Sequence, residues 1–237
     1  MSRLITLLLL TLCAAAHAGE RLLSTTQGDE IPLTVHAAEG DRLIVWLSSE
    51  FGSTPRRSAL AEMLASQGTE VWTTDLHSAW FLPVGRYSLN RVDPAAISAI
   101  IDAAVTESGK QVYLMAEGRS VALALRGVRH WQLDTDDTSA LAGLLAFSPK
   151  LFVRTPQGGD AAEYLPIVTA SNLPVYILQP QESAAFWRIG RDMRELEKGG
   201  SPVFLQHLPG VSDGFHARAE FSDAEQTMTA RLPGLLH

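Results

Sequence analysis

Short, mostly apolar runs recur along the chain and alternate with amphipathic stretches of helical length. Continuous apolar runs bounded by turn residues are typical of strands that are covered on both faces of a sheet. The pattern predicts strands at residues 31–36, 42–47, 69–76, 111–116, 140–147, 173–178 and 201–208.

The stretches between these runs carry the start and stop signals of helices. Pro55 and Pro94 suit first helical positions, Asp93 suits an N-cap, and Gly68 and Gly109 suit helix ends. The signals predict helices at 55–68, 92–109, 119–131, 182–200 and 222–232, and a short one at 160–170. Strict alternation of strands and helices implies right-handed crossovers and a mostly parallel sheet.

The composition excludes several classes of protein. The chain has 237 residues, of which 46% are hydrophobic and 19% charged, so a globular domain is expected rather than a disordered chain. The formal net charge is −7, and the sequence has no basic cluster of the kind that grips a phosphate backbone. Nucleic acid is therefore not an expected partner.

The first 18 residues have the pattern of a secretory signal peptide. Arg3 precedes an apolar run at 4–12, and the small-x-small end Ala16-His17-Ala18 predicts cleavage after Ala18. The run is too short for a membrane helix, so no stable membrane insertion is expected after cleavage. Lipid anchoring at Cys13 is the alternative; otherwise the exported chain has no cysteine. We expect a periplasmic or secreted protein with one domain over residues 19–237.

Three phrases resemble those of the α/β-hydrolase superfamily. "YLMAEGRSVALALRG" resembles its strand, sharp turn and helix, "LPVYILQPQES" the strand before its acidic residue, and "LPGVSDGFH" its histidine loop. The resemblance covers nearly all of the chain after residue 18. It implies a three-layer α/β fold, with a mostly parallel central sheet of about seven or eight strands and helices on both faces. It also implies a hydrolase that acts on ester or other acyl substrates.

The turn that holds the nucleophile in this superfamily can be aligned in two ways. Gly118-Arg119-Ser120 fits a G-x-S-x-A pattern and makes Ser120 the nucleophile. Counting from the start of the strand instead places Gly118 where the serine should stand. The second alignment matches more of the neighbouring residues and is slightly favoured.

The other two triad positions are ambiguous in the same way. Asp213 stands where the superfamily has histidine before Gly-Phe, whereas His216 follows three residues later. The acid position falls on Ser183, with Glu182 just before it. A glutamate can orient an imidazole as an aspartate does. One alignment therefore gives Ser120, His216 and Glu182, and the other gives Gly118, Asp213 and Ser183.

Further candidates lie at the expected edge of the pocket. Ser48 stands near the place of the superfamily's oxyanion loop, and Gly52 and Val121 could offer backbone N–H groups to an oxyanion.

Glu117 and Arg119 flank the turn and could bind a polar ligand or form an exposed ion pair. His77 follows a strand at the edge where parallel sheets bind ligands. The loop 78–87 could cover the sheet edge or form an apolar wall for a ligand or partner.

Two hypotheses remain open. The first is a serine hydrolase of the esterase type, which the G-x-S-x-A match supports. The second is a non-catalytic protein that binds a small molecule or a periplasmic protein, which the replacements at Gly118 and Asp213 favour. The residues predict no cofactor and no metal site, because no histidine and carboxylate spacing supplies a set of ligands.

Overall fold

The computed structural model describes residues 18–25, 28–156 and 160–236 and contains one eight-stranded sheet. Its order is β1-β2-β4-β3-β5-β6-β7-β8. Strand β2 is antiparallel to both of its neighbours, and the other neighbouring pairs are parallel. The strands are β1 (Ala18–Ser24), β2 (Glu30–His36), β3 (Arg42–Leu47), β4 (Thr69–Thr74), β5 (Gln111–Glu117), β6 (Leu141–Phe147), β7 (Val175–Pro180) and β8 (Val203–Leu208).

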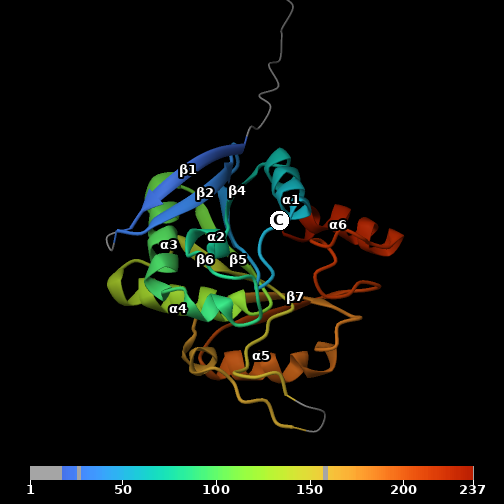
Figure 1. Cartoon of the computed structure of the whole chain (residues 1–237). Helices are drawn as coiled ribbons and strands as arrows, with labels where there is room; N and C mark the ends of the chain where they lie inside the picture. The colour runs from blue at the N-terminus through green and yellow to red at the C-terminus, as the bar shows by residue number, and fades with distance from the viewer. Residues whose placement is uncertain (1–17, 26–27, 157–159, 237) are drawn as a thin grey trace, which may run out of the picture.

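Helices cover both faces of this sheet (Figure 1). The α-helices are α1 (Pro55–Ser66), α2 (Leu76–Ala79), α3 (Pro94–Ser108), α4 (Ser120–Asp134), α5 (Ile189–Lys198) and α6 (Asp223–Leu235). Successive residues of β3 point to opposite faces, as the pleat requires. Leu43 and Val45 pack in the core with α3, α4 and α5, whereas Ile44 and Trp46 pack with α1 and α6. The predicted α/β class, with a mostly parallel sheet and two helical layers, is confirmed.

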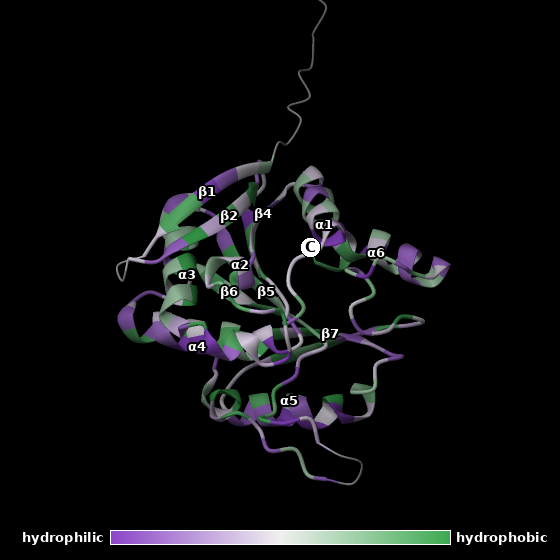
Figure 2. Ribbon diagram, in the orientation of Figure 1, coloured by the Kyte–Doolittle hydropathy of each residue, from purple (hydrophilic) through white to green (hydrophobic). Residues whose placement is uncertain are grey.

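The periodicity of the sequence explains the helix orientations. Helix α5 carries both hydrophilic and hydrophobic residues along its length (Figure 2). Its Ile189 and Leu196 are buried against the sheet, while Arg191 and Arg194 are exposed. Such an apolar stripe is what fixes a helix on a sheet.

The ends of the parallel strands position the site. Strands β3, β5 and β6 lie side by side, with Val45 of β3 beside Leu114 of β5. Their carboxyl ends are Leu47, Glu117 and Phe147. The loops that follow these three residues therefore meet at one edge of the sheet, where ligands bind in open α/β sheets.

Two helix predictions and one strand boundary were partly wrong. Only the 3₁₀ turn η2 (Pro166–Ala170) forms in the described part of 160–170. The helix expected from residue 182 begins at Ile189, after the 3₁₀ turn η3 (Phe186–Arg188), because the Ser183 hydroxyl accepts a hydrogen bond from the backbone N–H of Ala185 and closes a turn. Strand β4 ends at Thr74, and the next residues begin α2.

The amino-terminal strand β1 is not apparent in the apolar pattern, because it is an edge strand with mostly exposed residues. Residues 1–17, which hold most of the predicted signal segment, lie outside the described residues. Within the described ranges, none of the helices is long and apolar enough to cross a membrane.

Candidate functional site

The turn between β5 and α4 is occupied by Gly118. Its φ of +55° lies in the left-handed region, which glycine adopts without strain. Its N–H donates to the carbonyl of Phe147 and its carbonyl accepts from the N–H of Lys150, so the turn is fixed to the end of β6. A Cβ atom at this position would lie 2.5 Å from Oε2 of Glu50. A side chain therefore fits here only if Glu50 moves.

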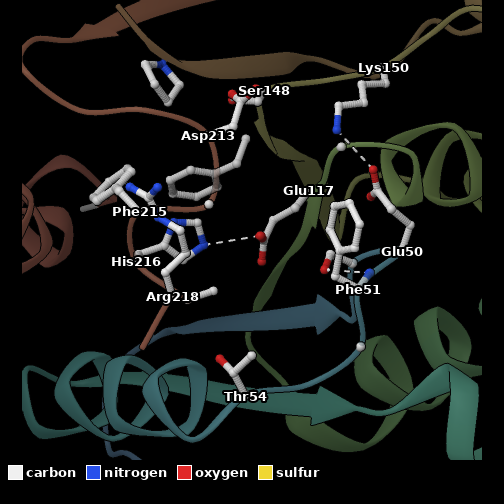
Figure 3. Close-up of a pocket in the computed structure, with 17 residues that line it drawn as sticks. Glu50, Phe51, Thr54, Glu117, Ser148, Lys150, Asp213, Phe215, His216 and Arg218 are labelled. Carbon is white, nitrogen blue, oxygen red and sulfur yellow. Dashed lines mark hydrogen bonds and ion pairs between the residues drawn. The ribbon is translucent and has the colours of Figure 1, made fainter. Parts of the chain in front are cut away.

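Glu50 comes from the loop after β3 and places its carboxylate over this turn. Its Oε2 accepts a hydrogen bond of 3.0 Å from the backbone N–H of Arg119, the residue that follows Gly118. Its Oε1 lies 3.1 Å from Nζ of Lys150. A dashed line marks this ion pair in Figure 3. The carboxylate also lies at the amino-terminal end of α4, where the helix dipole favours negative charge. Glu50 is only 1% exposed, so these contacts compensate for the burial of its charge.

A cavity of about 330 Å³ opens beside this carboxylate, and we call it the elbow cavity. The rings of Phe51 and Phe215 form apolar parts of its wall (Figure 3), and Phe147 lines it as well. Glu117 and His216 contribute polar groups to the same wall. The volume and the mixture of aromatic rings with a few polar groups are typical of small-molecule sites.

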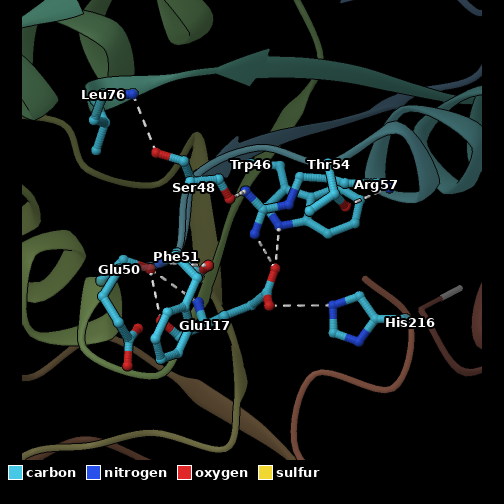
Figure 4. Close-up of polar contacts among 12 residues, drawn as sticks. Trp46, Ser48, Glu50, Phe51, Thr54, Arg57, Leu76, Glu117 and His216 are labelled. Atoms are coloured by element: carbon cyan, nitrogen blue, oxygen red, sulfur yellow. Dashed lines mark hydrogen bonds and ion pairs between the residues drawn. The ribbon is translucent and has the colours of Figure 1, made fainter. Parts of the chain in front are cut away.

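Glu117 is the centre of a buried polar cluster (Figure 4). Its Oε1 accepts hydrogen bonds from Nε1 of Trp46, at 3.2 Å, and from Nη2 of Arg57. Its Oε2 lies 3.2 Å from Nε2 of His216. Burial alone would raise the pKa of Glu117, but Arg57 and His216 outweigh it and hold the pKa well below its usual range. Glu117 is therefore a carboxylate at all physiological pH values.

The imidazole of His216 packs among aromatic rings. Its ring centre lies 4.8 Å from that of Phe147 and 5.1 Å from that of Phe215, and the side chain is 1% exposed. Nε2 is at ion-pair distance from Glu117 but is not aligned for a hydrogen bond. Within the described residues, no serine hydroxyl is hydrogen bonded to either ring nitrogen.

Solved structures similar to this chain include several esterases. An esterase from the archaeon Pyrobaculum calidifontis gives a TM-score of 0.69 at 12% identity, over 92% of this chain and 82% of that one. Thermogutta terrifontis esterase 2 gives 0.64 at 16% identity, over 92% and 93%. A fungal esterase from Rhizomucor miehei gives 0.66 at 13% identity, over 93% and 81%.

The protein has the α/β-hydrolase fold. The central sheet and its two helical layers agree with this assignment. No protein-family model and no curated protein matches the sequence. At such low identities the structural similarity establishes the fold alone, so any activity has to be argued from the site.

The structure does not join the three residues of the first alignment. The hydroxyl of Ser120 donates to the carbonyl of Glu117 at 2.8 Å and accepts from its N–H at 3.0 Å, and Ser120 has no exposed surface. His216 contacts Glu117 instead, and Glu182 is exposed and donates its N–H to the carbonyl of Val211. Ser120 as a nucleophile stays a prediction for a labelling experiment.

The residues of the second alignment do meet at the edge of the α/β-hydrolase sheet. Oδ1 of Asp213 accepts a hydrogen bond of 2.6 Å from the hydroxyl of Ser148, and Oδ2 accepts one of 3.0 Å from the hydroxyl of Ser183. Asp213 and Gly118 both line the elbow cavity. Asp213 therefore acts as a hydrogen-bond acceptor for two hydroxyl groups here.

The predicted oxyanion residues have other contacts. The Ser48 hydroxyl accepts from the N–H of Leu76 at 3.1 Å and is fully buried. The N–H of Gly52 donates to the carbonyl of Ser49, although Gly52 does line the elbow cavity. Val121 is buried within α4 and is not part of the cavity wall. The N–H group that the turn does present, that of Arg119, already binds Glu50.

Glu117 and Arg119 do not form the exposed ion pair considered above, because both are about nine-tenths buried. Nη1 of Arg119 donates to the carbonyl of Phe152 at 3.2 Å.

His77 is buried outside the cavity, with Nε2 2.8 Å from the hydroxyl of Ser88. Burial lowers its pKa, and the nearby Asp75 opposes this shift only in part. The described residues contain no cluster of three His, Cys, Asp or Glu side chains suited to a metal ion.

Sequence reasoning missed Glu50, Arg57 and Lys150. The sequence does hold a signal for Glu50: it is a charged residue that comes directly after the apolar run of β3 and two serines. Lys150 likewise follows β6 by three residues. Strands β3 and β6 lie on either side of β5, so charged residues at their carboxyl ends are candidates to meet, and these two do.

Proposed function

We propose that this protein is a non-catalytic member of the α/β-hydrolase fold that binds a small molecule in the elbow cavity. The observation that carries the proposal is Gly118 in the left-handed turn with the Glu50 carboxylate against it. Acyl transfer at this turn needs a nucleophilic side chain and a free N–H group for the oxyanion. Gly118 supplies no side chain, and Glu50 takes up the N–H of Arg119.

The surroundings of the turn also support a non-catalytic protein. A general base must reach the proton of its nucleophile. The imidazole of His216 is held against Glu117, and the Ser120 hydroxyl is engaged by the backbone of β5. At the position where the superfamily has histidine, Asp213 accepts hydrogen bonds from two serine hydroxyls, so no imidazole is there to transfer a proton.

Covalent labelling with a fluorophosphonate probe tests the catalytic part. The wild-type protein, shown to be folded by circular dichroism, is expected to remain unlabelled and to leave p-nitrophenyl acetate intact. Labelling that disappears in Ser120→Ala would overturn the proposal and establish the esterase alternative. Labelling that persists in Ser120→Ala would overturn it as well, and peptide mapping would then name the reactive serine.

Ligand binding is tested with phenyl acetate as a probe, using ligand-observed NMR. Ala217 lines the elbow cavity, so Ala217→Trp is expected to fill it and abolish binding. Ala219 is exposed and is not part of the wall, so Ala219→Trp is the matched control and should bind as the wild type does. Equal binding by both variants would place the probe elsewhere and contradict the proposal.

We also propose that the protein is exported after cleavage behind Ala18. The apolar run and the small residues before that position support this. Strand β1 begins at Ala18, so cleavage would remove only one of its residues and leave its pairing with β2. The amino-terminal mass of the protein purified from a bacterial periplasmic fraction tests the site; an intact Met1 would contradict it.

A further inference from the structure

A second cavity of about 390 Å³ adjoins the elbow cavity and shares Glu50, Phe51, Lys150 and Asp213 with it, and we call it the arginine cavity. Four basic and two acidic side chains line it: Arg86, Arg119, Lys150, Arg188, Glu50 and Asp213. The chain as a whole has a net charge of −7, so this excess of positive charge is local. A concave site with such an excess attracts anions.

Arg119 provides the strongest sign of a missing partner. The side chain is only 7% exposed, and one nitrogen, Nη1, donates to the carbonyl of Phe152. Nε and Nη2 are buried and have no hydrogen-bond partner among the described residues. Burial lowers the pKa of Arg119, and the nearby Tyr87 and Glu50 oppose this shift only in part. Buried charged donors without partners are costly, so an acceptor is expected there.

Arg188 is the second buried guanidinium of this cavity. It is 6% exposed, and its Nε also lacks a partner in the described ranges. Its Cζ lies 4.3 Å from the ring centre of Phe152, and that of Arg119 lies 5.5 Å from the same ring. Phe152 therefore lies between the two guanidinium groups, and the ring of Tyr87, 4.5 Å from Cζ of Arg119, holds that group from another side. Two fixed forks of N–H donors suit the oxygens of a carboxylate.

The remaining basic side chains are already engaged. Lys150 is paired with Glu50, and Nη1 of Arg86 donates to the hydroxyl of Thr155. Apolar side chains complete the wall, among them Phe51 and Trp187, each 65% exposed. Exposed rings at the rim of a cavity can cover the apolar part of a ligand.

We propose that the arginine cavity binds a small carboxylic acid with an apolar tail. Its carboxylate accepts hydrogen bonds from Arg119 and Arg188, and the tail lies against Phe51 and Trp187. The inference goes beyond the proposed function, because it concerns a different cavity and holds whether or not the protein is a catalyst.

Isothermal titration with 4-phenylbutyrate tests this site, with 4-phenylbutanamide as its neutral analogue. The acid is expected to bind at least about tenfold more tightly than the amide, which corresponds to about 1.4 kcal/mol. Arg119→Met should weaken binding of the acid by at least about tenfold. Arg129→Met is the control, because Arg129 is exposed on α4, the helix that follows Arg119, and does not line the cavity.

Equal affinity for the acid and the amide would overturn the proposal. An equal loss of affinity for the acid in Arg119→Met and Arg129→Met would overturn it as well. Absence of binding for 4-phenylbutyrate, octanoate and phenyl phosphate up to about millimolar concentration would overturn it too. Inorganic phosphate that binds as tightly as the acids would refute the role of the tail. If Arg119→Met does not fold, Arg188→Met carries the same expectation, and the comparison of acid with amide needs no variant. None of these results bears on labelling by the fluorophosphonate probe.

Discussion

Replacing Gly118 by alanine measures how firmly Glu50 occupies the turn. The new Cβ would lie 2.5 Å and 2.9 Å from the two carboxylate oxygens of Glu50, so the carboxylate must move away. It would then lose the N–H of Arg119 and its contact with Lys150. A hydrogen bond to a charged group contributes about 1.5–3 kcal/mol. A left-handed backbone costs a non-glycine residue a further amount of about 1–2 kcal/mol.

The free energy of unfolding of Gly118→Ala should therefore fall by about 2.5–5 kcal/mol in the wild-type background. In the Glu50→Ala background only the backbone cost of about 1–2 kcal/mol remains. Gly109 is a matched control, because its φ is +63° and a Cβ there meets nothing within 4 Å. Gly109→Ala should cost the same in both backgrounds.

Urea denaturation of the four proteins in this double-mutant cycle gives the coupling energy between Gly118 and Glu50. We expect about 1.5–3 kcal/mol, since contacting residues are not additive. A coupling energy near zero, with Gly118→Ala equally costly in both backgrounds, would refute the placement of Glu50 over the turn. It would also remove the main support for a non-catalytic protein.

Three further predictions concern the surroundings of the site. The pKa of Glu117 is depressed from its ordinary 4.5, so its stabilising contribution is present above that value and is lost as the pH falls. Glu117→Gln should lower the unfolding free energy by about 3–5 kcal/mol at neutral pH. The urea midpoint of this variant should also decrease less steeply at acidic pH than that of the wild type. Gly127→Ala brings a Cβ within 2.4 Å of Cβ of Ile97 and should lower the unfolding free energy by about 1–3 kcal/mol in urea, whereas Gly190→Ala, whose Cβ meets only the Arg194 side chain at 3.7 Å, should not destabilise. Ser222→Ala removes the N-cap of α6 and should lower the unfolding free energy by about 1 kcal/mol.

The fold could be predicted from the sequence because local and global signals agree. Strand β3 has the predicted bounds, and α3 begins after the N-cap Asp93 and ends at the left-handed Gly109. These elements are defined by apolar periodicity and by residues that act on their own backbone. Strand β1 and the region 160–170 lack such signals, so they were missed or only partly predicted.

The site could be predicted only in part, because its contacts join distant segments. The sequence allowed two alignments for the turn. In the structure the sharp bend lies at Gly118, the residue with the positive φ. Glu50 and Lys150 are 100 residues apart, and Arg57 and Glu117 are 60 apart. No local pattern relates such pairs. Only the strand order, which brings the ends of β3, β5 and β6 together, makes them neighbours.

The two carboxylates at the turn, those of Glu50 and Asp213, are both hydrogen bonded. Glu50 fits only because Gly118 has no side chain, and it gains the N–H of Arg119 that an oxyanion would otherwise use. Asp213 fits because Ser148 and Ser183 both donate hydroxyl groups to it. Random loss of a catalytic side chain would leave the carboxylates that face it without donors, which is costly. The carboxylates at this turn have partners, so we interpret it as a site adapted to binding rather than as a damaged catalytic centre.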